Sequence, residues 1–166
     1  AKLKRVLAID PNWRGFGFVV LAAPSKLIDW GVKSVRPEDE SKLLRRVSVL
    51  IRLYRPETII LEEPNNPRRC ERIRLLLLKI GDVAKSEGIK HRLIKVSRMK
   101  KVFMSFGAVT KYEIAKEIAH QIPDFAVRLP KFRKPWMSED YSMPIFDAAA
   151  LAITYFYSAL HLTNPR

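Results

Sequence analysis

The sequence predicts an α/β domain with five strands. Its first 34 residues hold three short apolar segments, separated by glycine and proline, which is the pattern of antiparallel strands joined by tight turns. Residues 38–54 then switch to the 3.6-residue period of an amphipathic helix, and another apolar strand follows at 57–62. Antiparallel strands followed by alternating helices and strands are typical of α/β domains.

Each element has its own local signal. Strands are expected at 3–10, 15–22, 27–34, 57–62 and 89–96, where apolar segments are bounded by turn residues. The helix after 38–54 is expected to begin at Pro67, because proline is favoured at the first helical position, and to run to about residue 87. Ser97 is expected to cap a short helix to about residue 104.

The C-terminal third begins with a clear helix start. Thr110 and Glu113 have the spacing of a capping box, which places Lys111 in the first turn of the next helix. Residues 122–143 are rich in proline and are expected to be irregular, and an apolar helix should follow at 144–160.

Length and composition indicate one domain spanning residues 1–166. The hydrophobic content of 48% is enough to build a core in a chain of this length. Cys70 is the only cysteine, so no intrachain disulfide can form, and a reducing, cytoplasmic environment is expected. No signal peptide or membrane-spanning segment is expected either.

The charge of the chain points to a polyanionic partner. The formal net charge is +14, and residues 68–101 alone contain twelve Lys or Arg against three acids, a net +9. A generic basic surface would be spread more evenly. Trp13 is more typical of a core residue, whereas other basic and aromatic residues are candidate nucleic-acid contacts, namely Arg14, Arg68, Arg69, Arg72, Lys100, Lys101, Lys131, Arg133, Lys134 and Trp136.

Three acids lie on apolar elements. Asp10 ends the first strand before Pro11, Glu62 ends the strand at 57–62, and Asp147 lies in the first turns of the last helix. One Asp before a proline would be interpreted as a turn residue. Three acids in apolar settings can instead converge if the strands are neighbours and the helix packs on them, and clustered carboxylates favour divalent cations.

These motifs together resemble those of a known family. The Ile9-Asp10-Pro11 opening with its glycine-rich hairpin, the strand ending in Glu62, the segment from Gly107 to Lys111, and the helix from Asp147 to Thr154 are similar to the RuvC-like Holliday junction resolvases of the ribonuclease-H-like nuclease superfamily. The resemblance implies a mixed five-stranded sheet with helices on both faces.

The resemblance also implies an activity. It indicates a Mg²⁺- or Mn²⁺-dependent endonuclease that cleaves branched DNA such as four-way junctions, with two ions held by Asp10, Glu62 and Asp147. Lys111 resembles the lysine that lies near the scissile phosphate in this family. A lysine in the first turn of a helix is usually exposed to solvent. The alternative interpretation is therefore that Lys111 is an ordinary surface residue.

Two positions depart from the family pattern. One helical turn before the last Asp, where the family has a fourth metal ligand, this chain has Pro144; Asp140 is the chosen substitute, with Glu63 and Glu139 as alternatives. An aromatic wedge after the Glu strand is replaced by Pro64-Asn65-Asn66. The alternative functions are therefore a ribonuclease-H-like nuclease or transposase-type domain acting on another DNA or RNA, and a catalytically weakened nucleic-acid-binding module.

The sequence also suggests a homodimer. In the helix at 67–87, Leu75 and Leu78 lie outside the apolar stripe that faces the core. The corresponding helix pairs chains in the RuvC-like resolvases, which makes this helix the candidate interface. A terminal segment packed over the two leucines is the alternative.

Overall fold

A computed structural model describes residues 4–132, 134, 137 and 139–162 of the chain. The strands are β1 (Val6–Asn12), β2 (Gly15–Ala23), β3 (Lys26–Ser34), β4 (Thr58–Glu62) and β5 (Lys90–Ile94). The helices are α1 (Glu40–Tyr54), α2 (Glu71–Ser86), α3 (Val96–Ser105), α4 (Lys111–Gln121), the 3₁₀ helix η1 (Pro123–Arg128) and α5 (Met143–Leu162).

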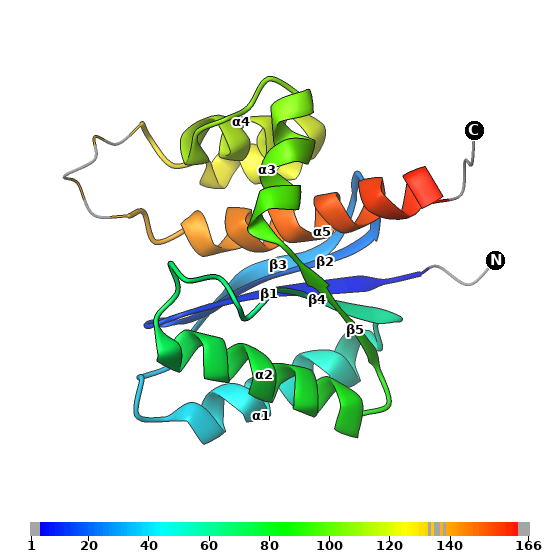
Figure 1. Ribbon diagram of the computed structural model, residues 1–166, viewed down its shortest axis with the longest axis vertical. Coiled ribbons are helices and arrows are strands. Elements are labelled where there is room, and N and C mark those ends of the chain that lie inside the picture. Colours follow the sequence, from blue (N-terminus) through cyan, green and yellow to red (C-terminus); the bar gives the residue numbers. More distant parts are fainter. Residues whose placement is uncertain (1–3, 133, 135–136, 138, 163–166) are drawn as a thin grey trace.

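The strands form one mixed sheet in the order β3-β2-β1-β4-β5. The β1–β2 and β2–β3 pairs are antiparallel, whereas β1–β4 and β4–β5 are parallel. Helices α1 and α2 cover one face of the sheet, and α5 lies across the other with α3 and α4 beyond it (Figure 1). The predicted five-stranded mixed sheet with helices on both faces is thereby confirmed.

Strand β1 lies at the centre because it is apolar on both faces. Leu7 and Ile9 pack with the α1 and α2 side of the core, whereas Val6 and Ala8 pack with the α5 side. Strand β4 repeats this alternation, with Ile60 on the α5 side. Since side chains alternate along a strand, Asp10 and Glu62 are both directed to the α5 face.

Glycine at position 17 lets α5 approach the sheet. Gly17 pairs with Asp10 across the β1–β2 ladder. A Cβ placed on Gly17 would lie 2.3 Å from the carbonyl oxygen of Pro144, so any side chain here would push the start of α5 away. The close contact brings Asp147, on the second turn of α5, toward the end of β1.

Several local expectations are corrected by the structure. Strand β1 continues through Pro11 to Asn12, and α2 begins at Glu71 instead of Pro67, because residues 63–70 form a turn-rich loop around Asn66. Helix α3 begins at Val96 with Lys95 at its N-cap, so Ser97 is not the cap. The predicted cap of α4 is confirmed, since the Thr110 hydroxyl accepts a hydrogen bond from the Glu113 backbone N–H.

Two further observations complete the fold. Trp13, expected in the core, is 62% exposed because it lies in the β1–β2 turn. Across the described part of the chain, no helix combines the length and the apolar character that crossing a bilayer requires.

Candidate metal and nucleic-acid site

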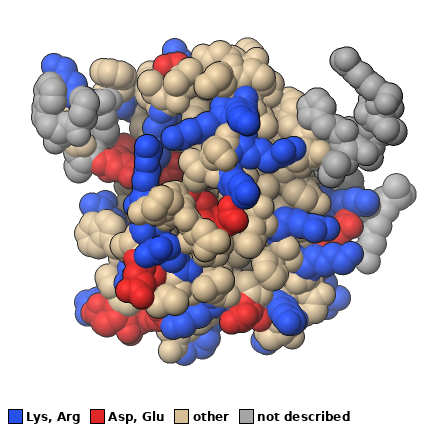
Figure 2. All heavy atoms as spheres, in the orientation of Figure 1, with Lys and Arg blue, Asp and Glu red and all other residues tan. Residues whose placement is uncertain are grey.

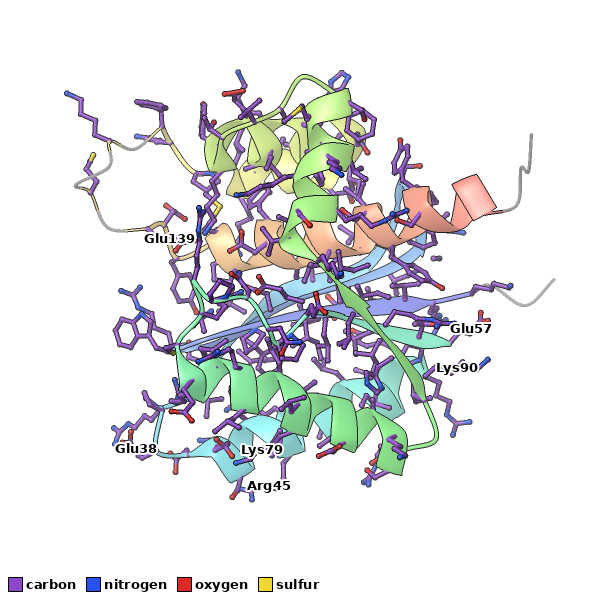
Figure 3. All side chains as sticks on the ribbon, viewed as in Figure 1. Glu38, Arg45, Glu57, Lys79, Lys90 and Glu139 are labelled. Carbon is purple, nitrogen blue, oxygen red and sulfur yellow. The ribbon has the colours of Figure 1, made fainter. Side chains whose placement is uncertain are left out.

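The site lies where β1 and β4 end. The parallel register pairs Ala8 with Ile60, and two residues further along each strand this register places Asp10 level with Glu62. Figure 3 shows Glu139, just before α5, at this end of the molecule. Glu57 and Lys90 lie at the other end, where β4 and β5 begin. The carboxyl ends of parallel strands are a common position for ligand sites in open α/β sheets.

A cleft of about 760 Å³ opens over these strand ends. Its wall includes all three predicted acids and Lys111, together with residues from the β1–β2 turn, the β4–α2 loop, α3 and the segment before α5. The structure therefore brings Asp10, Glu62, Asp147 and Lys111 together in one cleft, although they come from four separate elements.

The acids differ in their exposure. The side chains of Asp10 and Glu62 are 5% and 6% exposed, whereas that of Asp147 is 26% exposed. Burial raises the pKa of Asp10 to about 6; the nearby guanidinium of Arg69 acts against this shift, and the charge of Glu62 adds to it. Burial together with the charge of Asp10 raises the pKa of Asp147 to about 8, with Lys111 acting against the rise.

Two cations of the chain contact these acids. Arg69 lies between Asp10 and Glu62, with its Nη2 2.7 Å from Asp10 Oδ1 and its Nε 2.7 Å from Glu62 Oε2. Lys111 Nζ lies 3.3 Å from Asp147 Oδ2 and donates to Glu139 Oε1 at 2.5 Å. Burial acts to lower the pKa of Lys111, but attraction to these acids outweighs it and the pKa is raised.

The donor set suits a hard divalent cation, but it is not gathered into a finished site. Carboxylate oxygens are the ligands that Mg²⁺ and Mn²⁺ prefer, and burial raises the pKa values of Asp10 and Asp147, which a bound cation would lower again. Within the described residues, no group of three His, Cys, Asp or Glu side chains is close enough to hold a metal ion. Asp10, Glu62 and Asp147 thus remain the candidate ligands.

The predicted substitute for the fourth ligand lies in the wall of the cleft. Asp140 lines the cleft, and its Oδ1 accepts a hydrogen bond from the backbone N–H of Ser142 just before α5. Pro144 also lines the cleft and offers no side-chain ligand. Glu139, through its hydrogen bond to Lys111, is a member of the site that the sequence ranked only as an alternative.

The predicted nucleic-acid contacts divide into two groups. Arg14, Arg68, Arg69 and Lys100 line the cleft. Lys101, Lys131 and Lys134 are exposed elsewhere and Arg72 is half-buried, whereas Arg133 and Trp136 lie outside the described residues. Figure 2 shows Lys and Arg side chains spread across the face that α3 and β5 present, where Lys95, Arg98, Lys100 and Lys101 are exposed.

The roles of Arg69 and Asn66 were not apparent in the sequence. Asn66 Nδ2 donates to Glu62 Oε1 at 2.9 Å, and Arg69, expected to contact nucleic acid, is paired with the buried acids. The sequence offered one signal for these roles, which is position. Both residues come no more than seven residues after Glu62, the carboxylate that ends its strand.

Two solved structures resemble this chain closely in fold. One is described as Thermus thermophilus RuvC in complex with a Holliday junction substrate and the other as the Thermus thermophilus RuvC structure. Each has a TM-score of 0.69 and 21% sequence identity, and covers 95% of this chain and 96% of the RuvC chain. The chain has the ribonuclease-H-like fold of RuvC. No protein-family profile and no curated protein sequence matches it.

Proposed function

We propose that this chain is a Mg²⁺- or Mn²⁺-dependent endonuclease that cleaves branched DNA, with the four-way junction as its main substrate. The observation that carries the proposal is the convergence of Asp10, Glu62 and Asp147 in one cleft of a RuvC-like fold. The likeness to a RuvC structure that holds a Holliday junction supports DNA as the substrate class.

The residues of the cleft divide the chemical work between them. Asp10, Glu62 and Asp147 would hold divalent ions, which when bound activate water and stabilise the leaving oxygen of a phosphodiester. Lys111 is 53% exposed and adjacent to Asp147, so its ammonium group can stabilise negative charge that develops on a phosphate in the cleft. The basic side chains around the cleft position the DNA backbone.

Exposed aromatic groups beside the cleft fit a substrate with unpaired bases. Trp13 is 62% exposed in the β1–β2 turn, and the guanidinium of Arg14 lies 4.8 Å from the centre of its ring. Tyr141, which also lines the cleft, is 53% exposed, and its hydroxyl forms a hydrogen bond with the hydroxyl of Ser34. Aromatic platforms of this kind stack on the faces of unpaired bases.

A non-catalytic nucleic-acid-binding module is the second candidate. Pro144 favours it, because proline cannot supply a metal ligand at the start of α5. Cleavage in the presence of Mn²⁺ separates the two candidates.

The test is incubation with Mn²⁺ and three labelled substrates: a four-way junction, a linear duplex of the same sequence, and an RNA hairpin. We expect cleavage of the junction, and none by Asp10→Asn, Glu62→Gln or Asp147→Asn. These variants should bind the junction in EDTA as tightly as the unmodified protein or more tightly, because each removes a group that can carry negative charge near a phosphate. Cleavage of duplex or RNA in preference to the junction would contradict branched-DNA specificity.

Binding gives a second, independent measurement. The affinity for DNA should fall steeply with salt, and replacing a phosphate-contacting residue such as Lys100 or Arg68 by Gln should lower the magnitude of the slope by about 1. A salt-independent affinity would contradict the role of the basic surface.

We also propose that the chain acts as a symmetric homodimer through α2. Two strands of a junction must be cut and each chain carries one cleft of this kind in its described part, so two copies related by a two-fold axis would match the substrate.

A further inference from the structure

The guanidinium of Arg69 uses all three of its nitrogens at the ends of β1 and β4. Its Nη2 and Nε contact Asp10 and Glu62, and its Nη1 donates to the carbonyl oxygen of Pro11 at 3.4 Å. The two carboxylates are almost fully buried, whereas the Arg69 side chain retains 27% exposure. One positive charge is thus held at the inner end of the cleft, with an open path toward solvent.

The β4–α2 loop holds Arg69 in this position. Asn66 donates to Glu62 through its side-chain amide, and its side-chain oxygen accepts from the backbone N–H of Arg68 at 3.0 Å. The backbone carbonyl of Asn66 accepts from the N–H of Arg69 at 3.1 Å. The loop therefore turns back on the strand that carries Glu62 and directs the Arg69 side chain across to β1.

A divalent ion held by Asp10 and Glu62 would compete with Arg69 for these carboxylates, because Arg69 contacts one oxygen of each and Asn66 contacts the second oxygen of Glu62. Two buried carboxylates this close repel each other unless a cation lies between them. In the absence of metal, Arg69 meets that need with paired, charge-assisted contacts. Since both cations carry positive charge and compete for the same two buried carboxylates, binding of metal disfavours the position that Arg69 now holds.

We propose that Arg69 is an internal cation that occupies the divalent-ion position between Asp10 and Glu62 and must swing out when metal binds. This inference rests on the metal dependence in the proposed function. Two consequences follow. The affinity for metal is reduced by the free energy needed to break both ion pairs, and metal binding releases a guanidinium into the cleft, where it can contact a phosphate.

Arg69 and Lys111 have distinct roles in this scheme. Lys111 contacts Asp147 and Glu139, whereas Arg69 contacts Asp10 and Glu62. Arg69 is thus a positioning residue that acts through the two strand-end acids.

The first measurement is Mn²⁺ affinity without DNA, by isothermal titration of the unmodified protein, Arg69→Gln and Arg68→Gln. Arg68 is the matched control, because it is exposed in the same loop and lines the same cleft. We expect Arg69→Gln to bind Mn²⁺ at least about tenfold more tightly, the size expected for losing a charge-assisted contact that competes with metal, and Arg68→Gln to change by less than about threefold. Equal affinities in all three proteins would overturn the inference.

The second measurement follows the Arg69 side chain itself. In a ¹⁵N–¹H spectrum of the metal-free protein, the Nε–H of Arg69 should give a protected signal, assigned by its loss in Arg69→Gln. Addition of Mg²⁺ should remove its protection as the side chain enters solvent. A signal that stays protected at saturating Mg²⁺ would overturn the inference.

A charge-preserving variant covers the case in which Arg69→Gln does not fold without metal. Arg69→Lys keeps the charge but cannot contact both carboxylates with one planar group, so its Mn²⁺ affinity should lie above that of the unmodified protein. Failure of every protein to bind Mn²⁺ would also overturn the inference. Because no substrate is present, equal Mn²⁺ affinities would overturn the role of Arg69 and leave the proposed function, which the cleavage test decides, standing.

Discussion

At the scale of single residues, the cleft is defined by carboxylates held where water cannot fully solvate them. An ionised Asp10 that is 5% exposed would be costly without a cation, and the structure supplies one from the chain itself. The attraction to Asp10 and Glu62 outweighs the effect of burial on Arg69, so the pKa of this guanidinium is raised and it stays charged. The site is therefore electrostatically completed by arginine in one state and, as we propose, by metal in another.

The raised pKa values predict how the stability of the metal-free protein depends on pH. The pKa of Asp10 is raised from 3.8 to about 6 and that of Asp147 to about 8, so between about pH 4 and pH 8 the folded chain binds more protons at these residues than the unfolded chain. Their contribution to stability must then fall as pH rises through this window. We expect the Tm in EDTA to fall more steeply between pH 5 and 8 for the unmodified protein than for Asp147→Asn.

Metal should reverse this trend, because divalent ions bind the charged carboxylates and stabilise the folded state that holds them. Millimolar Mg²⁺ should raise the Tm more at pH 8 than at pH 5. Parallel Tm profiles for the unmodified protein and Asp147→Asn, with and without Mg²⁺, would contradict the prediction.

The acids could be predicted from local sequence, whereas their partner could not. Asp10 and Glu62 each follow an apolar segment and precede a proline or a Glu-Pro pair, and this signal lies within a few residues. Arg69 contacts Asp10 across 59 positions of the chain, and its direction depends on the turn at Asn66. Charge alone therefore predicted that Arg69 contacts nucleic acid.

At the scale of elements, the site depends on how closely α5 approaches β2. Local patterns predicted that a strand and an apolar helix would be present, but the distance between them depends on Gly17. The predicted start of α2 at Pro67 was wrong for a similar reason. Proline is common at the first position of a helix, but the hydrogen bonds of the loop around Asn66 place the start of α2 at Glu71. Helix boundaries that depend on tertiary contacts cannot be derived from propensity.

Gly17→Ala should therefore damage the site from a distance. The added Cβ would lie 2.3 Å from the Pro144 carbonyl oxygen, which is backbone and cannot rotate away. The start of α5 must shift, and Asp147 moves with it. We expect a loss of stability of about 1–3 kcal/mol, as for other overpacked sites, and a large fall in Mn²⁺-dependent cleavage.

Gly31→Ala on β3 is the control for this change. Its added Cβ would meet the Phe18 ring at 3.1 Å, and a side chain can shift by the few tenths of an ångström required. Thermal melting and cleavage of the four-way junction should separate the two variants. Full activity in Gly17→Ala would show that the approach of α5 does not control the position of Asp147.

At the scale of the whole molecule, the charge of the chain suits the nucleic-acid substrate that we propose. The net charge of +14 coexists with a cleft whose deepest members are acidic. This arrangement suits a polyanion drawn to the basic surface and metal ions drawn to the acids. The order of elements was predictable from periodicity, whereas the mixed sheet with helices on both faces was implied by the resemblance to RuvC-like resolvases.

Assembly is the remaining property at this scale. In α2, Ile73, Leu76, Leu77 and Ile80 are buried against the sheet, whereas Leu75 and Leu78 are 48% and 53% exposed. No contact in the described part of the chain removes these two leucines from solvent. Exposed apolar residues on one helix face are typical of a surface that pairs with another chain.

The double variant Leu75→Glu with Leu78→Glu should therefore be a folded monomer. It should still bind a four-way junction, because the cleft is unchanged, but it should cut the two opposing strands independently instead of in pairs. Sedimentation of the protein with and without the junction measures the first property, and a supercoiled cruciform substrate measures the second, since paired cuts linearise it and single cuts only relax it.

Val127→Glu is the matched control for this double variant. Val127 is 82% exposed on η1, which packs with α4 on the opposite side of the sheet from α2, so a charge there should leave the dimer intact. If the unmodified protein sediments as a monomer both alone and on the junction, two-fold pairing through α2 is wrong. Paired cutting of a junction would then lose its structural basis, and a nuclease acting on one strand of another substrate would become the better proposal.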